Sequence, residues 1–186
     1  MNNQTLRVVL AGALAGALAW GAGCTSVPSG VDPSYQVVES SMLGSWTSPA
    51  GTSIQIDRVG TRAFEIELHD GTSDATYRGH LLSIDGKRFV EVSLFQPEKS
   101  SEVPVYHYAM VDEIGPDALT HRPIKAQWLA EASRNIAGAI YQSTAQEQPD
   151  TGGVVVRNRG AMLQLLRKAS NDPSAFGPPE TLKRKK

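Results

Sequence analysis

Hydrophobic and polar residues alternate through most of residues 43–122, and turn residues interrupt this alternation at regular intervals. The clearest run has Phe64, Ile66 and Leu68 separated by glutamates. A period of two predicts strands with one buried and one solvated face. Asp85-Gly86 between two apolar runs is typical of a hairpin, because both central positions of a type I′ turn need a positive φ. We therefore expect an antiparallel meander.

Seven strands are predicted in this region, at residues 44–48, 52–57, 64–68, 75–84, 87–95, 103–112 and 118–122. After Pro123 the period becomes helical, which predicts one helix over residues 125–137 and a second that ends before Pro173. The two apolar stripes consist of Trp128, Leu129, Ala132 and Ile136, and of Met162, Leu165, Leu166 and Ala169. Residues 139–144 are a further candidate strand, and residues 154–157 are expected to be the closing strand. The expected fold is mainly β with minor α, a barrel or sandwich of about eight strands with two short helices in the C-terminal half.

The first 23 residues combine a charged start, an apolar run and small residues just before Cys24, which is typical of a secretory signal peptide. The apolar run at residues 8–23 is rich in Ala and Gly and falls short of the roughly 18 residues that span a bilayer. An export signal is therefore favoured over a membrane anchor. Cys24 is the only cysteine, so we expect no disulfide, thiolate nucleophile or cysteine metal site.

The sequence Gly21-Ala22-Gly23-Cys24 resembles the lipobox of bacterial lipoproteins, in which the cysteine receives a diacylglycerol and becomes the first residue. It departs from that pattern at Gly21, where the family usually has Leu, and this leaves cleavage after residues 17–19 as the alternative. The resemblance implies acylation of Cys24, with palmitate-type chains that hold the protein in a membrane. Thr25 in place of Asp implies the periplasmic side of the outer membrane in a Gram-negative bacterium.

The predicted organisation is a signal peptide at residues 1–23, a flexible tether at 24–41, a β domain at 42–177 and a basic disordered tail at 178–186. Residues 1–23 contain Arg7 and no acid, so the rest of the chain carries 17 basic against 19 acidic residues, a formal charge of −2. This balance gives no basic surface for nucleic acid. The tail is the one basic cluster; a solvated terminus is favoured over contact with anionic lipid.

Gly44-Ser45-Trp46 at the start of the first strand resembles the Gly-x-Trp signature of lipocalins. The resemblance implies a small barrel in which Trp46 plugs one end, Gly44 permits close approach, and a late arginine packs over the indole. Arg157 or Arg159 is the candidate for that arginine. The helix before the last strand departs from the lipocalin order. The layout also resembles that of bacterial lipoproteins whose small β domain begins with a Gly-x-Trp strand, a likeness that supplies no activity.

Candidate binding residues are few. His107 lies between Tyr106 and Tyr108 and shares a strand face with valines, so it is either a hydrogen-bonded core residue, which we favour, or a polar group in a cavity. His80 is the next candidate, and His69 and His121 read as exposed. The sequence contains no metal-ligand spacing, nucleophile elbow or phosphate loop, so we expect no metal, no cofactor and no catalytic residue.

Two functions are expected to compete. The first is a non-enzymatic binding or interaction module of the cell envelope, with another envelope protein as its partner. The second is a carrier that holds a small apolar or amphipathic ligand in the barrel, fixed by His107 and the neighbouring tyrosines. A periplasmic enzyme that uses His107 or His80 is third.

Overall fold

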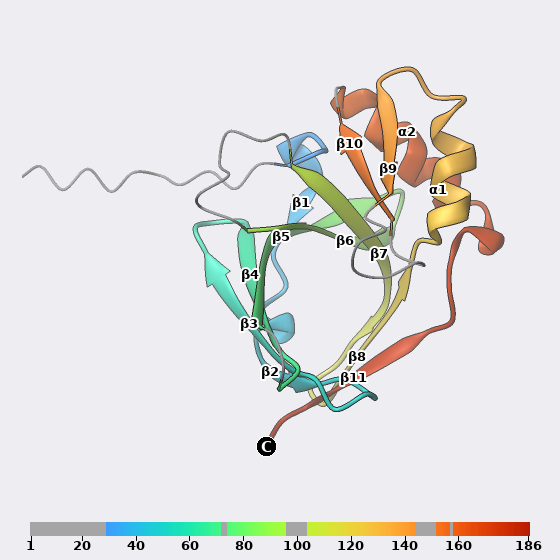
Figure 1. Cartoon of the computed structure of the whole chain (residues 1–186). Coiled ribbons are helices and arrows are strands. Elements are labelled where there is room, and N and C mark those ends of the chain that lie inside the picture. The colour runs from blue at the N-terminus through green and yellow to red at the C-terminus, as the bar shows by residue number, and fades with distance from the viewer. Residues whose placement is uncertain (1–28, 72–73, 96–103, 144–151, 157) are drawn as a thin grey trace, which may run out of the picture.

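The computed structural model describes residues 29–71, 74–95, 104–143, 152–156 and 158–186 (Figure 1). Eight antiparallel strands form a closed barrel in which each strand pairs with the next, and the last pairs with the first. The strands are β2 (Gly44–Thr47), β3 (Ser53–Val59), β4 (Ala63–His69), β5 (Asp74–Ile84), β6 (Lys87–Leu94), β7 (Val105–Ile114), β8 (Ala118–Pro123) and β11 (Glu180–Arg184). The predicted meander and fold class are confirmed, and Asp85 has a positive φ of 49° in the β5–β6 turn.

The strand that closes the barrel differs from the prediction. The tail expected to be disordered forms β11, in which Arg184 pairs with Trp46 on β2 and Leu182 pairs with Leu119 on β8. The segment expected to close the barrel is instead β10 (Gly152–Val156), which forms a hairpin with β9 (Ala139–Ser143) and extends the sheet at β7. Closure needs a strand that pairs with both β2 and β8, and among the described strands β11 pairs with both.

The predicted flexible tether is also wrong over the part that the structure describes. Residues 29–42 are ordered, with 3-10 helices at Pro33–Tyr35 and Ser40–Met42. Between them β1 (Gln36–Val37) pairs with Leu82 and Leu81 on β5. The N-terminal segment therefore lies against the barrel instead of separating it from what precedes it.

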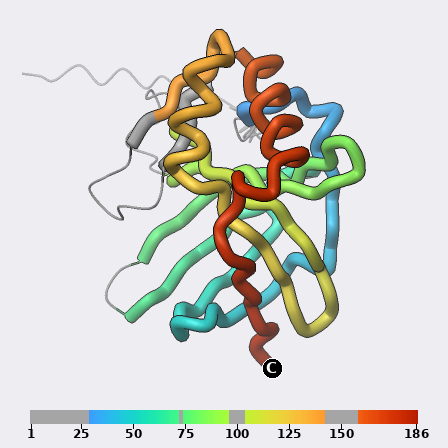
Figure 2. The backbone as a smooth tube through the Cα atoms, turned by 90° about the vertical axis from the view of Figure 1, so that its right-hand side faces the viewer, coloured from blue at the N-terminus to red at the C-terminus, as the bar shows by residue number. Residues whose placement is uncertain are grey.

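Two hydrophobic clusters lie on the two faces of the sheet. The inner cluster lies inside the barrel, and its buried members are Met42, Trp46, Ile54, Ile56, Phe64, Leu81, Val111, Leu119 and Leu182. The outer cluster lies between the outer face of β5–β7 and the helices α1 (Ala126–Ser133) and α2 (Arg159–Ser170). Figure 2 shows both helices on one side of the barrel and the C-terminus on the opposite side.

Both helices follow from the sequence pattern. The predicted stripe on α2 is fully buried, and the Asn158 side chain caps its first turn by accepting a hydrogen bond from the Gly160 N–H at 2.8 Å. Leu129 and Ala132 bury the corresponding face of α1, which ends at Ser133, four residues before the predicted end, so that Ile136 lies beyond the helix. In the part of the chain that the structure describes, every helix is too short or too polar to cross a membrane.

Candidate functional site

A buried carboxylate lies on the outer face of β6. The pleat points Val90 and Val92 into the barrel and turns Phe89 and Glu91 toward the outer cluster. The Glu91 side chain is completely inaccessible to solvent. Register places His80 of β5 on one side of it and Tyr108 of β7 on the other, so three polar side chains form a row across three strands.

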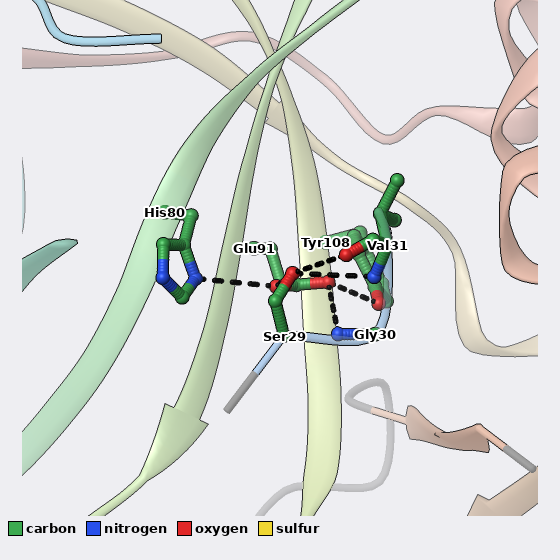
Figure 3. A network of polar contacts seen from close by, with 6 residues as sticks. All are labelled: Ser29, Gly30, Val31, His80, Glu91 and Tyr108. Carbon is green, nitrogen blue, oxygen red and sulfur yellow. Dashed lines mark hydrogen bonds and ion pairs between the residues drawn. The ribbon is translucent and has the colours of Figure 1, made fainter. Parts of the chain in front are cut away.

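The carboxylate holds the N-terminal segment (Figure 3). One oxygen, Oε1, accepts a hydrogen bond from the Ser29 hydroxyl at 2.7 Å. The other, Oε2, accepts from the Gly30 N–H at 3.0 Å and from the Tyr108 hydroxyl at 2.7 Å. Val31 follows these two residues and is fully buried in the outer cluster. We call residues 29–31 the strap, because they cross the barrel wall and are fixed there by Glu91.

Gly79 lets the two strands at this site approach closely. A Cβ at this position would lie 1.8 Å from the backbone oxygen of Glu91, far inside van der Waals contact. Only glycine therefore permits this pairing of β5 with β6. The close approach brings His80, the next residue, beside Glu91.

The order of the groups determines what chemistry they can perform. The His80 Nδ1 lies 3.4 Å from Glu91 Oε1, and it has no hydrogen-bond partner within the described residues. In a Ser–His–acid relay the imidazole stands between hydroxyl and carboxylate and takes the hydroxyl proton. Here the carboxylate stands between Ser29 and His80. This arrangement can hold a backbone segment, but it gives the Ser29 hydroxyl no neighbouring base other than the carboxylate itself.

Burial keeps the tyrosines of this face protonated. It raises the pKa of Tyr108 far above its ordinary value, and the charge of Glu91 and the hydrogen bond to it act in the same direction. Burial, followed by the charge of Glu91, likewise raises the pKa of Tyr106, whose ring centroid lies 6.4 Å from that of Tyr108. Tyr108 therefore acts as a hydrogen-bond donor to the carboxylate.

The second polar feature is the plug at the end of the barrel where β2 begins. Trp46 is fully buried, and its indole N–H donates to the Met42 carbonyl at 2.8 Å. The Arg184 guanidinium lies 4.1 Å from the centroid of that indole ring. It also donates to the carbonyls of Leu43 at 2.9 Å and Ser41 at 2.6 Å.

Gly44 makes room for this arginine. Its φ is +120°, and a Cβ there would lie 2.6 Å from Arg184 Nη1. The expected plug residues Gly44 and Trp46 thus lie together, but the arginine over the indole is Arg184. The candidate Arg157 lies outside the described residues, and Arg159 is exposed at the start of α2.

The four predicted binding residues divide between the two faces of the sheet. His80, Tyr106 and Tyr108 lie on the outer face, and His107 is half-buried on the inner face, opposite Val92. They therefore do not form one site. Cys24 lies outside the described residues.

Of the other two histidines, His69 is exposed as expected, and its hydrogen bond to Asp74 raises its pKa. His121 is only half-exposed and donates to the Glu180 carbonyl. Burial lowers its pKa.

Glu91 was not predicted from the sequence. The available signal was its place on the strand face that also carries Phe89 and Phe95, where a glutamate is out of place unless it is paired. The described residues contain no group of three potential metal ligands. Comparison of the chain with family models, curated proteins and solved structures gives no match.

Proposed function

We propose that this chain is an exported lipoprotein, anchored through acylated Cys24 to the outer membrane, and that its barrel is a non-enzymatic binding or interaction module of the cell envelope. The observation that carries the proposal is the Glu91 centre, whose hydrogen bonds attach the segment that follows Cys24 to the barrel wall. A buried carboxylate used in this way has a structural task, and its neighbours are not ordered for nucleophilic catalysis.

The plug supports a lipocalin-like barrel within this proposal. A tryptophan in the first strand and an arginine from the last strand stack at one end, as the Gly-x-Trp resemblance implies. Trp46 and Phe64 help to fill the barrel near this end, which favours the outer surface as the place where an envelope partner binds.

Mass spectrometry of the full-length protein tests the anchor. After expression in a Gram-negative host, we expect a mature chain that begins at Cys24 and carries the added mass of a diacylglyceryl group and a further acyl chain. The Cys24→Ser variant should lack this mass and be released without detergent. An unmodified chain that begins upstream of Cys24 would contradict the proposal.

A carrier of a small apolar or amphipathic ligand is the second candidate. It is favoured by the barrel end farther from the plug, where Leu68 and Val92 point inward but are only partly buried and Leu94 is 40% exposed. Native mass spectrometry of the Cys24→Ser protein, purified without detergent, distinguishes the two candidates. An added mass that dissociates on denaturation supports the carrier, and a bare polypeptide mass supports the interaction module.

A further inference from the structure

The N-terminal segment is attached to the barrel along its length. Glu91 holds residues 29 and 30, and Val31 is buried in the outer cluster. Arg62 donates to the Pro33 carbonyl at 3.0 Å, and β1 pairs with β5. Arg184 binds the carbonyls of residues 41 and 43. From residue 29 onward this segment contributes no free length.

This attachment limits how far the barrel can lie from an acyl group on Cys24. Ser29 follows Cys24 by five positions, and a fully extended chain spans at most about 3.5 Å per position, or roughly 17 Å in all. The predicted tether to residue 41 would reach roughly 60 Å on the same basis. With a linker that reaches roughly 60 Å, the barrel could turn in any direction relative to the membrane. With one that reaches roughly 17 Å, the strap must stay near the lipid surface.

The position of the strap determines which side of the barrel is near the lipid. Glu91 is on β6, and in the closed ring β6 lies four strands from β2 in both directions. The strap and helices therefore lie on one wall, and β2 lies on the opposite wall. Figure 2 shows this arrangement, with the described N-terminal residues beside the helices and the C-terminus across the barrel from them.

We propose that the wall bearing the strap and the helices faces the phospholipid bilayer, and that the wall formed by β2 and β11 faces away from it. The inference rests on the proposed acylation of Cys24. The surface just after the strap carries two exposed arginines, since Arg62 contacts Pro33 and Arg159 lies near Asp32. Their two guanidinium groups suit lipid phosphates and outnumber the single carboxylate of Asp32. The C-terminal lysines then point away from the anchoring membrane and are available to an acidic partner.

Energy transfer from the barrel to labelled lipid tests this orientation. Because acylation blocks Cys24, a single introduced cysteine can carry a donor dye, either as Ser34→Cys beside the strap or as Ala50→Cys in the β2–β3 turn. Both positions are exposed. In vesicles of phosphatidylethanolamine and phosphatidylglycerol with an acceptor-labelled lipid, we expect several-fold greater transfer from position 34. Equal transfer from the two positions would overturn the proposal.

A longer linker is the matched control. Twelve Gly and Ser residues inserted between Ser26 and Val27 leave the strap and barrel unchanged, and they should bring the two transfer efficiencies close together. An unchanged difference would show that the strap does not set the orientation. Failure of the proposed function can be told apart from failure of the orientation. If the proposed function is wrong, the protein lacks the acyl mass and does not float with vesicles. Equal transfer from an acylated, vesicle-bound protein overturns the orientation alone.

Discussion

Replacing Arg184 by Met tests whether the plug holds the barrel closed. The guanidinium makes two partly buried bonds to the carbonyls of Ser41 and Leu43, and bonds from a charged donor contribute about 1.5 kcal/mol each at the low end. The contact with Trp46 adds about 1 kcal/mol. A third bond, to the exposed Pro116 carbonyl, is counted as zero because solvent competes for it. The expected loss in unfolding free energy is about 4 kcal/mol.

Urea denaturation followed by far-UV circular dichroism measures this loss. We expect a lower midpoint with an unchanged slope, because the surface exposed on unfolding stays the same. Arg184→Lys keeps the charge but cannot bind two diverging carbonyls at once, and it should recover less than half of the loss. A cost below about 1 kcal/mol for Arg184→Met would refute the reasoning, since it would mean that solvent replaces every contact.

Gly44→Ala extends the same test. Its Cβ would clash with Arg184 Nη1 at 2.6 Å, and the φ of +120° is strained for any side chain. In the Arg184→Met background the clash disappears and the strain remains. The two substitutions together should therefore cost less than the sum of their separate effects. Strict additivity would show that Gly44 and Arg184 do not meet.

Four further predictions follow from the structure. Tyr108→Phe should cost about 1.5–3 kcal/mol in urea denaturation, because it removes one hydrogen bond to a buried carboxylate; a neutral result would contradict the bond between Tyr108 and Glu91. Gly79→Ala should lower the melting temperature more than any Ala substitution at an exposed strand position, since its Cβ meets backbone 1.8 Å away, and a wild-type melting curve would contradict that packing. Burial lowers the pKa of His121, so below pH 6.5 the unfolded chain binds more protons at this residue than the folded chain, and stability falls as the pH decreases. His121→Gln should flatten this pH dependence in thermal melts between pH 5 and 7. An unaltered slope would show that His121 does not contribute to it. A chain that ends at residue 179 should aggregate, because β2 and β8 become free edges, and a monomer of native stability in gel filtration and urea denaturation would show that β11 is dispensable.

The sequence was sufficient for the meander because each strand there is defined locally. Phe64, Ile66 and Leu68 alternate within one strand, and Asp85-Gly86 specifies its own turn. The stripe on α2 is equally local. These patterns depend on the spacing of apolar residues along the chain and on backbone sterics. They do not depend on which other strand or helix packs against the element.

The closing strand and the Glu91 site depend on partners that are distant in the sequence. The strand face shared with Phe89 indicates that Glu91 needs a partner, but it does not identify that partner. Residues 180–184 contain one buried apolar side chain, Leu182, among polar and charged residues. They form a strand because they pair with the edges of β2 and β8. Arg184 was missed as the indole partner for the same reason. Glu91 stands beside His80 and Tyr108 only through the register of three strands, and its bonds to the strap join residues 61 and 62 positions apart.

The position of β11 also governs the order in which the barrel can assemble. The hairpins from β3 to β8 join neighbours in sequence, and contacts of this kind form early at low loop-closure entropy. The bond between Arg184 and Leu43 spans 141 positions, and the strands that it helps to join cannot meet until residue 184 is present. An incomplete chain, whether on a ribosome or part-way through a translocation channel, is therefore an open sheet with its tryptophan uncovered. Closure of the barrel therefore requires that β11 has been synthesised and delivered, because this strand joins β2 to β8.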